Sequence, residues 1–512
     1  MRKILKLCHN ELIKISRRAS IIVMTLLMVV GIFAIGGFIK LIYSSSMFSY
    51  DYSTSDPSGY LEELETEIAE LHRQLETIEP ADEEYPYSIG NLLDLTADAE
   101  RCRMILEDNT LSEILQNGYN YMSGVVDSLS MLRAAAEIEK TYPESAVICQ
   151  QYTGYEDIES MLREYENVYA EHDYNAYISL QKKEIKNNPF LSDNEKAIEI
   201  EALELYLKAD PNGENMGYEL QSAISGVISG KKILLTNMAT NYTGTSVPLS
   251  TDQREQLKDA VDATVYKLEN GYISLDSDTE ASAAEAGMSA MISVAFFLIL
   301  IMMILLAGSS VSQEITSGSI KSLIISPTRR WKIYTAKLTT LFLTGLVLTV
   351  AAYLLSTLTT QVLFGKLGYE PYVYMSNGTP RLISPFVYGL LNILLDYLMV
   401  FVFMAFAFML SVVTRNTAAA VSIPLGTYFI GSTVSAFLQM FGITGEWTKF
   451  LPFSHLSLSE KVFSTENLLN NMNFGVVQID SSPSLLFSVI YLAVLLFCML
   501  YTAFDSFTRR DL

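Results

Sequence analysis

The sequence contains little cysteine and little histidine, with four residues of each among 512. Four cysteines are too few for a scaffold held together by disulfides. Cys102 and Cys149 fall in the same long polar segment, and the sequence leaves open whether they form one bridge or stay as two buried thiols. The histidines lack metal-ligand spacing, and no catalytic triad or acid–base pair can be argued. We therefore predict neither a metal site nor an enzyme.

A phosphate-binding loop is also missing. The nearest match, "GVISGKK" at residues 226–232, has one residue too few between its glycines. It also has Lys232 where a serine or threonine would bind Mg²⁺. We expect this chain to bind neither ATP nor Mg²⁺ by itself.

What the chain does have is apolar sequence, since hydrophobic residues make up 50% of it. A run of about 20 apolar residues is long enough to cross a bilayer as a helix. Six such runs occur, at 19–42, 287–308, 338–364, 382–413, 418–442 and 485–504. A cleaved signal peptide is the rival interpretation of the first run, but its apolar part is long, Lys40 follows that part and no A-x-A site appears. We predict an all-α membrane protein with six transmembrane helices.

Charge is distributed unevenly. Residues 43–286 contain 47 acidic and 16 basic residues, and the rest of the chain contains 10 and 19. One large acidic domain therefore lies between the first two spans. Its "YLEELETEIAELHRQLETIE" carries a heptad seam that Pro80 ends, and further helices are expected near 91–117, 156–186, 193–208, 214–238 and 252–269. We predict a mainly helical domain whose acids coat solvated helix faces, with a surface for cations or basic peptides as the alternative.

Basic residues collect in four short segments, at 1–18, 309–337, 414–417 and 505–512. With six spans, all four fall on the same side of the membrane, and Lys and Arg near span ends favour the cytoplasm. Both termini are then cytoplasmic, and the 43–286 domain and the 443–484 loop are extracytoplasmic. Residues 1–18 have apolar side chains at helical spacing, which predicts an amphipathic helix on the bilayer surface.

The cytoplasmic segment 309–337 has a specific pattern. It carries the spacing E-x3-G-(T/S)-x-(K/R)-x-L-x3-P-x2-R, followed by a lysine, and its basic cluster includes Arg329; the positions are Glu314, Gly318, Ser319, Lys321, Leu323, Pro327, Arg330 and Lys337. This pattern resembles the coupling segment of ABC-2 type transporter permeases. The "NELIKISRR" before the first span and the final "FDSFTRRDL" are also similar to that family. The large domain after the first span resembles one subgroup of it.

The resemblance implies that the chain is the permease subunit of an ATP-driven exporter in a bacterial plasma membrane. A separate ATPase subunit would bind ATP and Mg²⁺ and would contact Glu314, Gly318, Lys321, Pro327, Arg329, Arg330 and Lys337. Two permeases would pair, and we expect a homodimer within membrane lipid, with no nucleic acid among its partners. A peptide, a lipid-like compound or another amphiphile is the expected substrate.

Small residues in the fifth span would allow close helix packing in lipid, either between two chains or within one; they are Ala418, Ala419, Ala420, Ser422, Gly426, Gly431 and Ser432. Asp396 is the one acid deep in a span, and Asn392 lies one turn before it. Because a charge in lipid is costly, this pair predicts an intramembrane polar site, for which a hydrogen-bonding role and a substrate contact remain open.

Other interpretations stay open beside the transporter. The 309–337 segment could be an ordinary basic loop, although that would not require its Glu, Gly and Pro spacing. The chain could be a mechanotransmitter or sensor without transport, resembling four-span permeases with a large outer domain. It could also be a membrane-anchored scaffold that uses the heptad seam and has no ATPase partner.

Overall fold

The computed structural model describes residues 2–44, 56–116, 120–188, 190–214, 217–240, 246–273, 279–317, 329–365, 370–440, 446–463 and 484–509. The chain divides into two compact units. Unit 1 comprises residues 1–44, 233–263 and 279–512, and unit 2 comprises residues 45–232 and 264–278. Two of the boundaries between them fall within helices, one in α12 (Tyr218–Thr236) and one in α13 (Thr251–Glu269).

Six helices of unit 1 are long and apolar enough to cross a membrane, as the sequence predicts. They are α2 (Ala19–Ser44), α14 (Thr279–Ser310), α17 (Arg330–Phe364), α18 (Pro385–Thr414), α19 (Thr417–Met440) and α22 (Leu485–Arg509). Helix α17 begins eight residues before the predicted apolar run, because residues 330–337 continue the same helix as two polar turns. The protein is therefore a membrane protein with six candidate spans.

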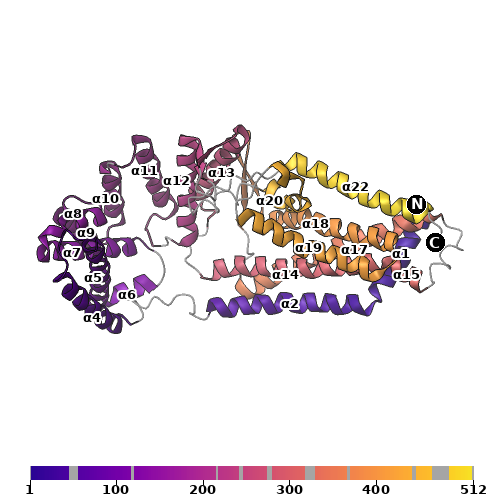
Figure 1. The fold of residues 1–512 in the computed structure, drawn as a ribbon, viewed down its shortest axis with the longest axis horizontal. Coiled ribbons are helices and arrows are strands. Elements are labelled where there is room, and N and C mark those ends of the chain that lie inside the picture. The colour runs from indigo at the N-terminus through magenta and orange to yellow at the C-terminus, as the bar shows by residue number, and fades with distance from the viewer. Residues whose placement is uncertain are drawn as a thin grey trace. The chain divides into compact units, whose positions relative to one another are not determined.

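Helix α14 packs against α2, α17, α18 and α19 and supplies much of the shared core (Figure 1). Its Ile299, Met303 and Ala307 have no exposed surface. Gly308 marks the closest approach to α19, since a Cβ atom there would lie 3.0 Å from the carbonyl oxygen of Ala420. Small residues let helices approach in this way in lipid, where packing rather than hydrophobic exclusion drives association.

Both termini lie at one end of this bundle, which we call the terminal end (Figure 1). Helix α1 (Arg2–Ser16) packs along the start of α17, and Arg330 donates to the carbonyl of Thr508 at 3.5 Å. The short α15 (Ser312–Thr316) meets the start of α19, where the Ser312 and Thr417 hydroxyls are 2.8 Å apart. The described parts of the four basic segments therefore gather at the terminal end.

Two of the connections between spans, at the end of the bundle opposite the terminal end, contain regular secondary structure where the sequence suggests loops. Strands β3 (Tyr372–Ser376) and β4 (Thr379–Ile383) form an antiparallel hairpin. Its two-residue turn needs positive φ at both positions, which Asn377 (53°) and Gly378 (74°) supply. Residues 446–463 form short helices that pack near α18, α19 and α22: η3 (Glu446–Phe450), η4 (Pro452–His455) and α20 (Leu458–Val462).

The remaining helices belong wholly to unit 2. They are α4 (Pro57–Leu75), α5 (Tyr85–Glu107), α6 (Asn109–Gln116), α7 (Tyr121–Thr141), η2 (Pro143–Ser145), α8 (Ala146–Thr153), α9 (Ile158–Glu171), α10 (Tyr174–Asn187) and α11 (Asp193–Ala209). A small hairpin of β1 (Met238–Thr240) and β2 (Ser246–Pro248) lies between α12 and α13 in the chain.

Several helices of unit 2 differ from the sequence prediction: the helix expected near 91–117 is divided into α5 and α6, and α8 was not expected. The single helix expected over 156–186 is two helices, because His172 takes a left-handed conformation (φ 51°) and the Asp173 carboxylate then caps α10. Helix α7 was not expected at all. Its Val125, Val126 and Leu129 have no exposed surface, and a helix covered on several sides lacks the one-sided apolar pattern that sequence reading relies on.

The heptad seam of α4 is covered within unit 2. Leu64 packs with Ala99 and Cys102 of α5, and Leu75 joins the main core of this unit. A seam already covered by its own chain does not favour the scaffold interpretation.

Cys102 and Cys149 are both fully buried thiols. They belong to two different hydrophobic clusters of unit 2, and no disulfide joins them in this structure. The structure therefore has the second of the two arrangements that the sequence left open.

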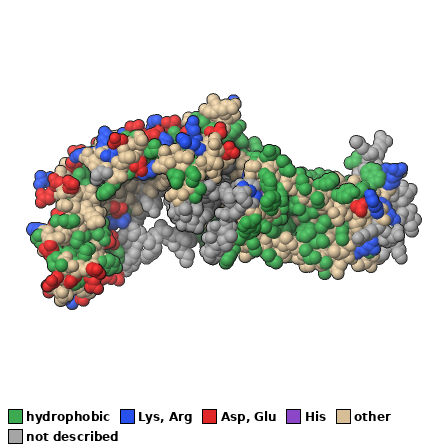
Figure 2. All heavy atoms as spheres, turned by 45° about the horizontal axis from the view of Figure 1, so that its top comes forward, with side chains coloured by type: hydrophobic (Ala, Val, Ile, Leu, Met, Phe, Trp, Pro, Cys, Tyr) green, Lys and Arg blue, Asp and Glu red, His purple; other side chains and the backbone are tan. Residues whose placement is uncertain are grey.

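The surfaces of the two units differ in chemistry (Figure 2). Hydrophobic side chains cover much of the visible face of the helix bundle, and Lys and Arg gather at its terminal end. Acidic and basic side chains are mixed over the visible face of unit 2. A bundle with an apolar outer face is what a bilayer requires of helices that cross it.

Candidate functional site

Four charged side chains form an ion cluster at the terminal end. They are Glu11 and Lys14 of α1, Glu314 of α15 and Lys337 of α17. The Lys337 ammonium donates to Glu314 Oε1 at 2.8 Å and to Glu11 Oε2 at 3.2 Å. Lys14 reaches the other Glu11 oxygen at 3.1 Å and Glu314 Oε1 at 3.3 Å. The cluster ties three segments together that lie far apart in the sequence.

The charges of this ion cluster differ in their access to water. The side chain of Lys337 is 3% exposed, those of Glu314 and Glu11 are 13% and 15% exposed, and that of Lys14 is 52% exposed. Burial alone would raise the pKa of Glu11, but the ammonium groups of Lys337 and Lys14 outweigh it and hold the pKa below its ordinary value. Two acids and two bases make the cluster neutral, which is the condition for keeping charges out of water.

Hydrogen bonds beside the ion cluster fix the position of α1. The Thr340 hydroxyl lies 3.4 Å from the carbonyl oxygen of Cys8, and the Cys8 thiol lies 3.7 Å from the carbonyl oxygen of Ala336. Ile15 is buried on the same side of α1, whereas Leu5 and Leu12 are exposed. The apolar residues of α1 thus divide between a face against α17 and a face open to its surroundings.

The structure gives Glu314 two partners within its own chain. The sequence predicts that Glu314 is presented to a partner protein, but its side chain points into the ion cluster and is largely buried. The physical reason is Lys337, whose buried ammonium needs carboxylates beside it. Glu314 and Lys337 therefore hold α15 against α17 and α1, and their contact with a partner protein stays a prediction.

The other residues of the predicted coupling segment divide into two groups. Gly318, Lys321 and Pro327 lie outside the described residues. Arg329 is exposed at the start of α17, while Arg330 is partly buried and donates to the C-terminal end of α22. Of the predicted coupling residues that the structure describes, Arg329 is the one with an exposed side chain.

The predicted polar site in α18 has a hydrogen-bond partner from another helix. The Ser459 hydroxyl of α20 donates to the Asp396 carboxylate, and Asn392 lies one turn earlier in α18. Asp396 is thereby used to hold the 446–463 segment against the bundle. This contact favours the hydrogen-bonding role that the sequence left open.

A second polar cluster, which the sequence does not predict, involves the same 446–463 segment. His455 is fully buried, with Nδ1 3.0 Å from the Ser488 hydroxyl and Nε2 2.8 Å from the carbonyl of Lys449. Lys461 donates to Ser488 at 2.7 Å. Burial lowers the pKa of His455, and the nearby Lys461 charge lowers it further. No motif marks this cluster, because its members come together only through tertiary packing.

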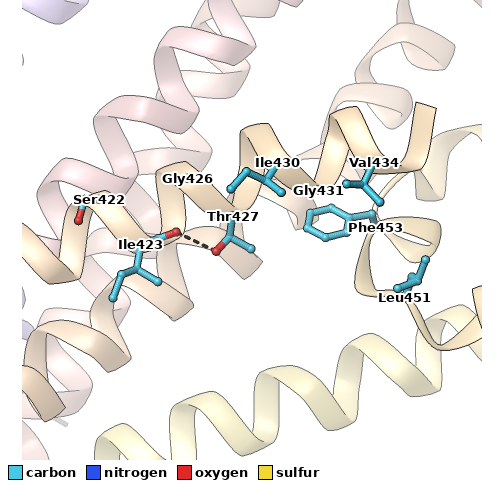
Figure 3. Close-up of a pocket in the computed structure, with 9 residues that line it drawn as sticks. All are labelled: Ser422, Ile423, Gly426, Thr427, Ile430, Gly431, Val434, Leu451 and Phe453. Atoms are coloured by element: carbon cyan, nitrogen blue, oxygen red, sulfur yellow. Dashed lines mark hydrogen bonds between the residues drawn. The ribbon is translucent and has the colours of Figure 1, made fainter. Parts of the chain in front are cut away.

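An apolar groove of about 490 Å³ runs along the outer face of α19 (Figure 3). Ile423, Ile430 and Val434 line it and are between 45% and 67% exposed. Phe453 closes one end, where its ring lies directly over Gly431. Gly426 faces open space, since a Cβ atom there would meet nothing within 4 Å.

The small residues of α19 are thus used in two ways. Ala420 and Gly431 pack within the chain, against Gly308 and Phe453 respectively. Ser422 and Gly426 line the open groove instead. Packing within one chain therefore holds for Ala420 and Gly431, and packing between two chains stays a prediction for Ser422 and Gly426.

The fold and its polar ends define a multi-span membrane protein. A family described as "Protein of unknown function (DUF2705)" matches residues 261–512. "Uncharacterized protein YhcI" of Bacillus subtilis (strain 168) is 28% identical over 219 residues, which is 41% of this chain. The alignment spans 63% of the length of that relative. No solved structure matches the chain.

Proposed function

We propose that the chain is the permease subunit of an ATP-driven exporter of ABC-2 type, powered by a separate ATPase subunit. The ion cluster carries this proposal, because it links the segment with the coupling pattern to two helices of the bundle. Lys337, on the long helix α17, forms ion pairs with both Glu314 of α15 and Glu11 of α1. A movement of α15 would reach the bundle through these bonds.

The proposed sidedness follows from the charges at the terminal end. This end carries both termini and the described parts of the four basic segments. The positive-inside rule then places the terminal end in the cytoplasm, where ATP is available. Unit 2, inserted between the first two spans, would lie outside the plasma membrane of a bacterium.

Six candidate spans support a transporter over the mechanotransmitter alternative, which predicts four. The groove on α19 supports pairing of two permeases, since it presents exposed apolar side chains and the open Gly426 within a span. Two chains that meet along α19 would enclose a pathway for a peptide, a lipid-like compound or another amphiphile. We propose a homodimer.

The ATPase partner can be tested by purifying the chain from its native membrane and asking whether an ATPase copurifies with it. Arg329→Glu reverses the exposed charge and should weaken copurification by roughly tenfold, because a like charge opposite a docking surface costs affinity. Arg381→Glu in β4, at the opposite end, is the matched control and should change nothing. If the unchanged chain brings down no ATPase, the proposed function is wrong.

The homodimer can be tested by crosslinking of introduced cysteines in a background that lacks Cys8 and Cys498 and keeps the fully buried Cys102 and Cys149. Cysteines at Ser422, Gly426 and Ile430 lie about one turn apart along the groove and should crosslink between chains. A cysteine at Ala420, which has no exposed surface, should not. Equal labelling without crosslinks at the three groove positions would reject α19 as the interface.

A further inference from the structure

A second cavity, of about 460 Å³, lies between α2, α14 and α19 at the terminal end. It belongs neither to the ion cluster nor to the groove of Figure 3. The side chain of Leu305, which lines it, is 40% exposed, so the cavity opens onto the outer surface of the bundle. A ligand could therefore enter it from the membrane.

The polar part of the cavity lies where the helices end. Arg18 and Ser20 lie at the start of α2, Ser309 at the end of α14, and Thr417 at the start of α19. These are positions at the boundary between a bilayer and water. Donors and hydroxyls at this depth match the level of lipid head groups.

The apolar part lies deeper along the same helices. Met24 is six residues into α2 from Arg18, which is about 9 Å along a helix. Met302 is seven residues before Ser309 in α14, about 10 Å along its helix, and Val421 is one turn beyond Thr417. The cavity thus changes from polar to apolar in the direction that leads into the bilayer.

Arg18 is the only cation that lines this cavity among the described residues. It is partly buried, and one guanidinium nitrogen donates to the Ser309 hydroxyl at 2.9 Å. No described carboxylate lies within salt-bridge distance of it, so its charge is not matched by an acid of the described chain. The planar guanidinium fork is suited to phosphate oxygens, which it binds through two parallel hydrogen bonds.

We propose that this cavity binds one anionic phospholipid, with its phosphate on Arg18 and an acyl chain against Met24 and Met302. The apolar depth of the cavity favours a lipid over free phosphate, which would leave that half empty. The single unmatched cation favours a net anionic head group over a zwitterionic one. Basic pockets between membrane helices bind such head groups in other proteins.

The test is native mass spectrometry of the full chain, purified in detergent and exchanged into equal amounts of phosphatidylglycerol and phosphatidylcholine. The unchanged protein should retain one phosphatidylglycerol in preference to phosphatidylcholine by roughly tenfold, as expected for a charge-assisted hydrogen bond. Arg18→Gln should abolish the preference, and Arg18→Lys should restore part of it. No ATPase is needed, so the result is independent of the proposed transport function.

Arg17→Gln is the matched control, because it removes the same charge from the neighbouring residue, which is exposed and does not line the cavity. It should leave the preference unchanged. Leu305→Trp would fill the apolar half of the cavity and should lower the retention of phosphatidylglycerol. This variant also tests the proposal if Arg18→Gln does not fold. Equal retention of both lipids, equal effects of the two glutamine variants, or displacement of the lipid by millimolar phosphate would each overturn the proposal.

Discussion

Lys337 gives the strongest test of the ion cluster, because its ammonium is the most deeply buried of the four charges. Lys337→Met keeps a long unbranched side chain and removes only the charge and its hydrogen bonds. Glu314 and Glu11 then stay largely buried, with Lys14 as their remaining partner in the cluster. The result depends on how much of the lost attraction Lys14 replaces.

The expected magnitude follows from the exposure of each partner. Removing one member of a buried ion pair costs about 3–5 kcal/mol, because the remaining charge stays out of water. Lys14 is half exposed, and exposed pairs contribute at most about 1 kcal/mol. We therefore expect Lys337→Met to lower the free energy of unfolding by about 2–4 kcal/mol.

The assay is denaturant unfolding in detergent, with thermal melting as a second readout. Lys14→Met is the control for charge alone and should cost less than about 1 kcal/mol. The triple variant Lys337→Met, Glu11→Gln, Glu314→Gln removes the unmatched carboxylates and should recover much of the loss. If Lys337→Met is as stable as the unchanged protein, or if the triple variant is less stable than the single one, the burial argument is wrong.

Three further predictions concern packing, pH and capping. Gly431→Ala should destabilise unit 1, because its Cβ atom would lie 1.7 Å from the Phe453 ring, whereas Gly426→Ala should be neutral, since nothing lies within 4 Å; melting of both variants checks this. The lowered pKa of His455 means that the unfolded chain binds a proton first as pH falls below about 6.5, so stability should fall there, and His455→Gln should flatten that part of the pH profile. Ser192→Ala removes the capping box of α11 and should cost about 1 kcal/mol in an unfolding measurement; no change would mean that the cap is not formed.

The sequence by itself determined the six membrane helices, the insertion of a helical unit between the first two and the positions of the basic segments. Long apolar runs and charge counts are local properties of the chain, so they can be read without knowing any contact. Helix ends were less accurate, as the polar start of α17 shows, because a helix continues past the apolar residues that mark it.

The tertiary structure alone decided what the polar residues contact. Glu314 and Lys337 were singled out by spacing, but their pairing with each other and with Glu11 depends on α1 folding back along α17, more than 300 residues away in sequence. His455 carried no motif, and Arg18 stood out in the sequence only as one basic residue of the segment before the first span. Burial determines whether a charge faces a partner or is neutralised within its own chain, and burial is a property of packing rather than of sequence spacing.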